Sequence, residues 1–262
     1  MIQMAMAAIA MLGVSTNSSA QEDLEFSMKT DFVSQYIWRG MDCGGISVQP
    51  TVDLGYKDFS IEIFGNAGLD QYDPKEIDLT LGYKWKEFNF GLTDYWQTGK
   101  DYRGQDLYFS YDAEKDAHQF EINVGYTHEL FDVQLYTMVW GNDFKYDSFE
   151  DYQAYQNGKR AFSTYLEVNV PLKWKEIDWN FCAGFTPFES ANSVNTTTDA
   201  SGRTRYQKNH FYADGFGCVK ASARATKTLD LGKIKLPLYA ELQANPYLKK
   251  AYFLVGATII PF

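Results

Sequence analysis

The histidines are the first residues to examine for chemistry, because imidazole is the commonest general acid or base in enzymes. His128 falls at a predicted tight turn, whereas His118 and His210 flank predicted loops. None of the three lies near a serine in a recognisable nucleophile motif, and the sequence has no HExxH, P-loop or dinucleotide-binding glycine pattern. We therefore expect solvated loop histidines, no catalytic residue and no cofactor, and predict that the chain is not an enzyme.

An acidic segment has the spacing of the first ligands of a calcium loop. It contains Asp112, Glu114 and Asp116. The glycine and the terminal glutamate that complete such a loop are missing, so the segment is predicted to be a solvated turn without a metal.

The three cysteines suggest one candidate disulfide. Cys182 and Cys218 fall on adjacent predicted strands, both at polar positions, so a bridge between them is conceivable in an oxidising compartment. Two free buried thiols are the alternative, and Cys43 is left without a partner in either case.

The composition narrows the classes of fold that could hold these residues. Of 262 residues, 45% are hydrophobic and 17% aromatic, and the formal charge is −10. This apolar content excludes disorder, and the acidic balance argues against nucleic acid as a partner. The mean hydropathy is −0.37, and no apolar run approaches the ~20 residues of a spanning helix. A β-rich fold remains, and the transmembrane β-barrel is the membrane class compatible with a polar average.

Apolar and polar residues alternate along most of the chain. In a typical segment Ile77, Leu79, Leu81 and Tyr83 alternate with Asp78, Thr80 and Lys84. A period of two indicates strands with one apolar and one polar face. The predicted strands are 25–39, 47–56, 59–69, 76–85, 88–96, 118–127, 131–140, 160–172, 177–187, 211–229, 234–245 and 251–262.

The connections between these strands are alternately short and long. Tight polar turns near 57–58, 86–87, 127–130, 173–176 and 230–233 separate mostly longer segments, of which 97–117, 141–159 and 190–209 are the main predicted surface loops. Counting 105–112 as a spanning strand would make thirteen strands. Twelve puts every long loop at one end and both termini at the other, as in bacterial barrels. We therefore predict an all-β fold, an antiparallel up-and-down transmembrane barrel of about twelve strands.

Aromatic residues gather near the ends of the predicted strands, as in the two aromatic girdles of a membrane barrel. They are Trp38, Tyr56, Phe59, Trp85, Phe88, Tyr126, Phe131, Trp174 and Trp179. Ordinary cross-strand aromatic pairs in a soluble sheet are the alternative.

Both ends of the chain carry features of exported barrels. Residues 1–20 combine an apolar stretch with Ser18 and Ala20 at cleavage-site positions, although no Lys or Arg precedes the stretch. We expect a cleavable signal peptide followed by one barrel domain, 21–262. The chain ends in an apolar strand with Phe262, which resembles the signal read by bacterial barrel-assembly machinery, and Phe262 is expected to face outward.

The opening of the predicted barrel resembles the TorF-type porin family. The similarity lies in the segments Tyr36-Ile37-Trp38-Arg39-Gly40, Gln49-Pro50, Gly55-Tyr56 and Phe64-Gly65-Asn66. It covers about forty residues, and Cys43 and the excursion 97–117 depart from it. The resemblance implies a first strand that ends in an aromatic-Arg-Gly element, a second strand that begins at a proline, and a porin in the Gram-negative outer membrane. It implies no catalytic residues.

The polar parity is the candidate functional surface, because it would line the interior of a membrane barrel. The channel-lining candidates are Lys29, Asp31, Arg39, Asp53, Glu62, Asp78, Lys84, Glu121, Asp132, Glu167, Asp178, Asp214, Lys220, Arg224, Lys235 and Glu241. Opposite charges could line a wet channel, or pair across it and plug it. Acids are in excess, so a conducting channel is expected to prefer cations weakly.

We predict a passive porin-like channel for small hydrophilic solutes, surrounded by outer-membrane lipid. The main alternative is a non-conducting barrel that acts through its surface loops, as an adhesin or a binder of glycans or partners. The loop 142–160 supports this alternative because it contains Phe144, Tyr146, Phe149, Tyr152 and Tyr155 among acids and amides. A lipid-modifying enzyme and a soluble secreted β-protein are the remaining alternatives.

Overall fold

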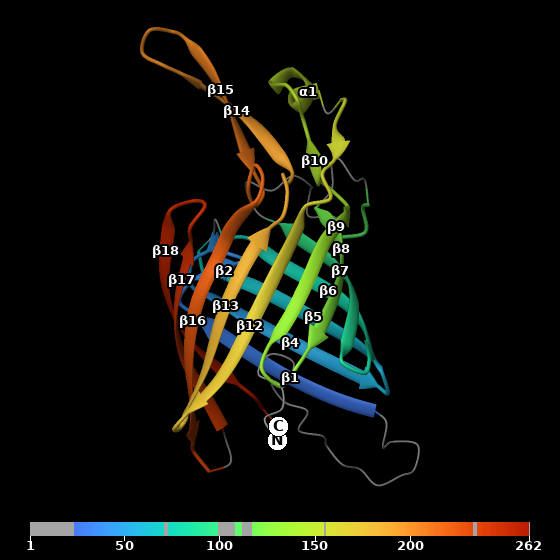
Figure 1. Cartoon of the computed structure of the whole chain (residues 1–262), viewed down its shortest axis with the longest axis vertical. Coiled ribbons are helices and arrows are strands. Elements are labelled where there is room, and N and C mark those ends of the chain that lie inside the picture. Colours follow the sequence, from blue (N-terminus) through green and yellow to red (C-terminus); the bar gives the residue numbers. More distant parts are fainter. Residues whose placement is uncertain are drawn as a thin grey trace.

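The wall of the molecule is a closed antiparallel barrel in the computed structural model, which describes residues 24–70, 73–98, 108–111, 117–154, 156–232 and 235–261 (Figure 1). In spatial order its strands are β1 (Leu24–Val33), β18 (Lys250–Ile259), β17 (Lys235–Asn245), β16 (Gly217–Asp230), β13 (Ile177–Thr186), β12 (Thr164–Trp174), β9 (Asp132–Trp140), β8 (His118–Thr127), β7 (Phe88–Thr98), β6 (Lys75–Trp85), β5 (Phe59–Gly68) and β4 (Ser47–Tyr56). Because β1 pairs with both β18 and β4, the sheet has no free edge. The predicted all-β barrel of twelve wall strands is confirmed.

The other described elements lie between wall strands at one end of the barrel. They are the hairpin β2 (Tyr36–Trp38) and β3 (Met41–Gly44), the pair β10 (Phe144–Lys145) and β11 (Lys159–Arg160) with α1 (Phe149–Ala154), and the hairpin β14 (Asn192–Thr198) and β15 (Thr204–His210). In Figure 1, β14, β15 and α1 project from the top of the barrel, which we call the loop end. The opposite end, which we call the turn end, carries the tight connections and the start of β1.

Three turns at the turn end share one local structure. The first turn residue is a lysine in the left-handed region, with φ of 55° at Lys57, 56° at Lys86 and 57° at Lys175. Each ammonium lies over the aromatic ring of the preceding residue, at 5.2 Å from Tyr56, 5.2 Å from Trp85 and 5.0 Å from Trp174. An acid follows each lysine, and the pattern makes compact polar turns between long strands.

The apolar parity of the strands faces outward. The side chains of Phe26, Ile61 and Phe181 are 41%, 41% and 42% exposed, and Leu79 is half-buried. They do not share a dry interior, as they would in a soluble sandwich. The polar parity therefore faces the space that the wall encloses, which we call the bore.

The first predicted strand, 25–39, is wrong in its second half. The wall strand β1 ends at Val33, and the chain then turns into the hairpin β2–β3. Ser34 bonds β18 at this point, with its hydroxyl accepting from the Val255 N–H at 2.9 Å. The alternation of apolar residues continues through Tyr36 and Trp38, so periodicity gave no sign of the break.

The early end of β1 and the positions of the neighbouring residues also correct the predicted aromatic girdle and the strand ends that the family resemblance implied. Trp38 lies in the hairpin against buried residues and not in a girdle, whereas Tyr56, Phe59, Trp85, Phe88 and Trp174 are exposed aromatics of the turn end. The element Arg39-Gly40 does not end a wall strand, and Pro50 lies within β4, not at its start.

Two wall strands begin four or more residues later than predicted. β12 begins at Thr164, because Phe162 adopts a left-handed φ of 51° that interrupts the strand. β16 begins at Gly217, because Tyr212 and Ala213 are buried in the mouth of the barrel, where Ala213 bonds Ser190 instead of a wall strand.

Residues 108–111 form no wall strand, and β7 pairs directly with β8. The predicted signal peptide 1–20, the acidic residues Asp112, Glu114 and Asp116, and Phe262 lie outside the described residues.

Candidate functional site inside the barrel

The hairpin β2–β3 lies inside the loop end of the barrel, with its turn residues buried, its strands half-buried and Asp42 exposed. Its turn residues, Arg39 and Gly40, have left-handed φ values of 49° and 81°. A Cβ on Gly40 would lie 1.9 Å from the Val219 carbonyl oxygen, so only glycine allows this approach. The Gly40 carbonyl accepts a hydrogen bond from Asn245 Nδ2 at 3.1 Å, which ties the tip of the hairpin to β17.

Arg39 binds the opposite wall through a bidentate ion pair. Its two terminal nitrogens donate to the two carboxylate oxygens of Glu121, on β8, at 2.6 and 2.7 Å. The two side chains are only 7% and 1% exposed. A bidentate charge-assisted pair is strong, and in a buried site neither charge can be removed alone without a large penalty.

Aromatic rings complete a cage around the guanidinium. Its central carbon lies 4.4 Å from the ring centroid of Trp38, 4.1 Å from that of Tyr136 and 4.7 Å from that of Tyr165. The Tyr212 hydroxyl accepts a further hydrogen bond from Arg39 at 2.6 Å. These rings come from the hairpin, β9, β12 and the 211–216 loop, so the cage extends across the bore.

A second contact holds the base of the hairpin. Tyr36 Oη donates to Glu76 Oε2 at 2.9 Å, and Gln97 Nε2 donates to the other oxygen at 2.5 Å. Burial, and then the charge of Glu76, raise the pKa of Tyr36 well above its usual value, so the phenol keeps its proton and remains the donor. The hairpin β2–β3, with its contacts at Glu76 and Glu121, is called the plug below.

The interior differs between the two ends of the barrel. At the loop end the inward residues Gln49, Glu167 and Gln243 are buried around the plug. Toward the turn end, the inward residues Ser60 and Lys84 are exposed. The bore is thus accessible from the turn end and narrowed by side chains at the loop end.

Glycines on the inner face help to keep the turn-end half wide. A Cβ on Gly91 would lie 2.1 Å from Asn123 Oδ1, and one on Gly125 would lie 2.1 Å from Gln134 Oε1. The neighbouring amides therefore lie along the wall, over the glycine backbone, and do not extend across the bore.

Charges on one side of the bore are paired between neighbouring strands. Lys220 Nζ lies 3.0 Å from Glu167, and the Arg224 guanidinium lies 2.6 Å from Glu241. These strands, β12, β16 and β17, therefore present a nearly neutral surface.

The opposite side is acidic. Asp53 and Glu62 are directly opposed on β4 and β5, and Glu76 and Asp78 follow on the inner face of β6. Asp78 is buried, and its Oδ1 atom has no hydrogen-bond partner among the described residues. We call these four residues the acidic wall. Lys29 lies on the neighbouring β1, opposite Thr51.

Register and burial place the sequence candidates as follows. On inward positions of wall strands lie Lys29, Asp31, Asp53, Glu62, Asp78, Lys84, Glu121, Asp132, Glu167, Asp178, Lys220, Arg224, Lys235 and Glu241. Arg39 is in the plug, and Asp214 is an exposed loop residue that accepts a hydrogen bond from Tyr247 Oη at 2.8 Å.

The candidate disulfide is not formed, and all three cysteines are free. Cys182 is opposite Ser222, whereas Cys218 is opposite Phe185 beyond a register shift. The bulge reverses the facing of the residues that follow it, so Cys218 shares the outward face of Phe185 and not the inward face of Cys182. The Cys43 thiol, in the plug, has its pKa raised to about 12 by burial and then by the Glu76 charge, so it is not a reactive thiolate.

His118 is buried, contrary to the solvated histidine predicted. Its Nδ1 lies 2.8 Å from Asp94, its Nε2 lies against the Tyr108 carbonyl, and Tyr111 stacks on the ring at 4.2 Å. Asp94 and His118 have the outward parity, and residues 108–111 lie over them on the outside of the wall. Both ring nitrogens lie against acceptors. His128 is exposed in its turn, as expected.

Several residues of the interior were missed by the sequence analysis. Glu76 has the same parity as Asp78, so alternation could have found it. Tyr95, Tyr136 and Tyr165 were missed because an inward tyrosine has no signature in a strand whose apolar residues face outward. Tyr212 was missed because it lies in the 211–216 loop, where a wall strand was predicted.

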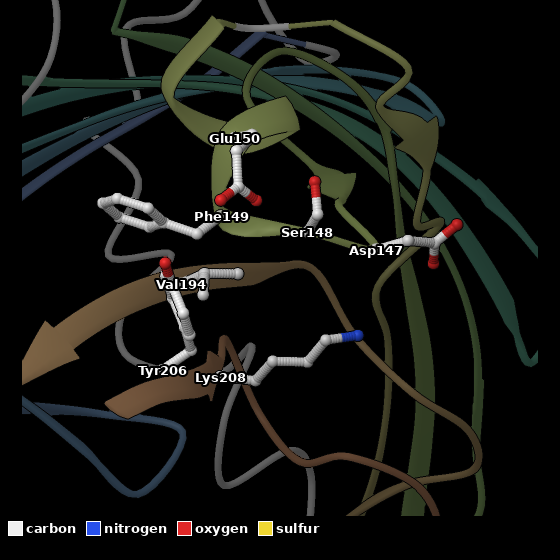
Figure 2. Close-up of a pocket in the computed structure, with 7 residues that line it drawn as sticks. All are labelled: Asp147, Ser148, Phe149, Glu150, Val194, Tyr206 and Lys208. Atoms are coloured by element: carbon white, nitrogen blue, oxygen red, sulfur yellow. The ribbon is translucent and has the colours of Figure 1, made fainter. Parts of the chain in front are cut away.

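The loop end also carries a surface pocket of about 360 Å³ (Figure 2). Phe149 and Glu150 of the α1 segment lie on one side of it, and Tyr206 and Lys208 of β15 on the other. The rings of Phe149 and Tyr206 are 5.5 Å apart. Tyr146, one of the loop aromatics named as support for the binding alternative, is only 2% exposed and packs within the loop. Tyr155 lies outside the described residues.

Within the described residues, no helix has the length and apolar character needed to cross a membrane. Protein-family models give no match to the chain, and curated protein sequences give none either.

Three solved structures with similar folds illustrate the weak likeness of this chain to known proteins. A structure from work on the in-meso crystallization of membrane proteins has 8% identity and a TM-score of 0.45, with 90% of this chain and 83% of that one covered. A porin has 9% identity and a TM-score of 0.35, with 84% and 62% covered, so the chain spans less than two thirds of its length. The CymD monoaromatic hydrocarbon channel has 9% identity and a TM-score of 0.31, with 92% and 87% covered. At these identities and scores the similarities assign neither a family nor a function.

Proposed function

We propose that the protein is an outer-membrane β-barrel that forms a channel for small hydrophilic solutes, constricted at the loop end by the plug. The observation that carries the proposal is the combination of a closed wall, an apolar outer face and a charged interior accessible from the turn end. A closed barrel is one of the two backbone structures that satisfy all their hydrogen bonds in a bilayer.

The membrane location is argued from the outer face. Leu81, Phe90, Val170 and Phe253 are among the large apolar side chains exposed around the wall. Contiguous apolar surface of this extent is unfavourable in water, whereas lipid chains cover it without cost. The exposed aromatics of the turn end fit one membrane–water interface.

An arginine on this face is expected to destabilise the barrel. Ile63, midway along β5, is 48% exposed, and Ile63→Arg should cost about 2–4 kcal/mol in a bilayer, because a guanidinium at mid-depth is poorly solvated. The matched variant Ile46→Arg, at the loop-end rim, should cost about 0–1 kcal/mol. Denaturant unfolding in lipid vesicles measures both, and equal costs would contradict a lipid-facing wall.

Export and assembly follow from the same proposal. Residues 1–20 would be the cleaved signal peptide, and the C-terminal strand with Phe262 would be recognised by the barrel-assembly machinery. The loop end, opposite the start of β1, would face the exterior of a Gram-negative cell. Membership of the TorF-type porin family is part of this proposal and rests on sequence similarity in the Arg39-Gly40 and Gln49-Pro50 segments, although their places in the fold differ from those that the resemblance implied.

The charges predict that the channel prefers cations. The acidic wall carries four carboxylates, whereas the lysine and arginine opposite it are neutralised by Glu167 and Glu241. Planar-bilayer recording of the refolded chain under a KCl gradient should give a reversal potential whose sign shows selectivity for K⁺ over Cl⁻. Glu62→Gln with Asp78→Asn should reduce the preference, and Asp178→Asn, beside Lys173 at the turn end, should leave it unchanged. An anion-selective reversal potential would contradict the assignment.

The alternative is a non-conducting barrel that acts through its loops, and two observations favour it. The plug occupies the loop end, and the pocket between α1 and β15 presents Tyr206 and Lys208 across from Glu150, groups that could bind a surface glycan. A refolded barrel that never conducts, even after removal of the plug, would favour this alternative.

A further inference from the structure

A cavity of about 210 Å³ lies beside the plug at the mouth of the barrel. It is bounded on one side by the hairpin β2–β3 and on the other by β7, β8, β9 and the 211–216 loop. Three aromatic residues line it, Trp38, Tyr95 and Phe211. The Trp38 ring centroid lies 5.7 Å from that of Tyr95 and 6.0 Å from that of Phe211, with interplanar angles of 66° and 60°. The Trp38 ring is thus inclined to the other two, so both ring faces and ring edges line the cavity.

The polar groups of the cavity are few. Gln97 and the Tyr95 hydroxyl donate to Glu76 and Glu121. Two other polar lining residues, the exposed Asp42 and the half-buried Gln119, have side chains without an ion-pair or hydrogen-bond partner among the described residues. None of the described lining residues is a lysine or an arginine, and the nearby Arg39 is neutralised by Glu121. The net charge of the cavity lining is therefore negative.

We propose that this cavity binds small organic ammonium cations, an assignment that names a solute class for the proposed channel and rests on that function for its biological meaning. Aromatic faces attract a poorly hydrated ammonium through their quadrupoles, and an unpaired carboxylate supplies the matching charge. A mostly apolar lining with a few convergent polar groups is typical of small-molecule sites.

An anion or a tightly bound metal ion fits the cavity less well. An anion would face the Asp42 carboxylate without a cationic partner. Asp42 is the one carboxylate of the described lining, whereas Ca²⁺ takes six to eight oxygen ligands. A bound ammonium would contact both the plug, through Trp38 and Asp42, and the wall, through Tyr95 and Gln119, so binding would be sensitive to the position of the plug.

Binding is tested by titrating the refolded full barrel in detergent with choline, followed by calorimetry and tryptophan fluorescence. Saturable binding is expected, and the uncharged isostere 3,3-dimethylbutan-1-ol should bind about tenfold more weakly, because it lacks the charge that the rings and Asp42 attract. Asp42→Asn should weaken choline binding about tenfold. Asp58→Asn makes the same change in charge at the turn end, and should leave binding as in the unsubstituted chain.

Equal affinity for choline and its uncharged isostere would overturn the proposal, as would equal effects of Asp42→Asn and Asp58→Asn or the absence of saturable binding. Heat-modifiable gel mobility verifies that each variant is folded. Conductance of the same preparations separates the two proposals: binding without conductance would reject the channel and keep the site, whereas conductance without binding would reject the site alone.

Discussion

Replacing the hairpin β2–β3 by a short linker is expected to raise the single-channel conductance several-fold. The hairpin carries Trp38 and Arg39 into the cage that fills the loop end, while the turn-end half of the bore is already accessible. Val33 and Ser47 are paired across β1 and β4, so a four-residue Gly-Ser turn in place of residues 35–45 can join the two wall strands without distorting them. Planar-bilayer recording of the unsubstituted and shortened chains measures the difference.

A matched deletion controls for the general effect of shortening a loop. The hairpin β14–β15 projects away from the wall, so replacing residues 194–208 by a turn should leave the conductance unchanged (Figure 1). Both variants should keep the heat-modifiable mobility of a folded barrel. If the chain without the plug were folded and did not conduct, the channel function would be rejected and the loop-based alternative favoured.

The second large effect is expected from Glu121→Gln. This substitution leaves the Arg39 guanidinium buried without its counter-charge, and breaking a buried pair in this way costs about 3–5 kcal/mol. Because the wall strands are held by their own ladders, we expect the cost to fall on the plug, which should leave its cage in a large fraction of molecules. The expected result is frequent opening toward the conductance of the plug-free chain.

A double variant distinguishes charge from packing in this prediction. Arg39→Gln with Glu121→Gln removes both charges and keeps amides in their place, so no uncompensated charge remains and the closed state should largely return. Tyr95 Oη, which donates to Glu121 at 2.7 Å, can still donate to an amide oxygen. If the single and double variants opened equally often, the plug would be held by something other than the ion pair.

The wall was predictable because apolar and polar residues alternate along each strand of a barrel. In β6 the odd-numbered residues, from Ile77 to Trp85, face outward. The even-numbered residues, from Glu76 to Lys84, face the bore. The tight turns after Tyr56, Trp85 and Trp174 interrupt this period visibly with a lysine and an acid. Local pattern therefore gave most of the strands and their two faces, whereas the number twelve came from the requirement that the long loops lie at one end and both termini at the other.

The plug was not predictable from the same pattern. Tyr36 and Trp38 continue the alternation of β1, yet they lie inside the barrel. The contacts that hold them there, Arg39 with Glu121 and Tyr36 with Glu76, form only when strands distant in sequence close into a ring. Two other features were unpredictable for the same reason, since they also depend on contacts that form only in the folded barrel. They are the bulge that separates Cys182 from Cys218 and the packing of residues 108–111 over His118.

Alternating side chains determined the strands and gave each of them one apolar and one polar face, and the alternately short and long connections then indicated a barrel with its apolar face outward. Which charges neutralise each other, where the passage is blocked and which rings surround Arg39 were decided by the tertiary structure. Those contacts join residues far apart along the chain, and their energies depend on burial that exists only once the barrel has closed.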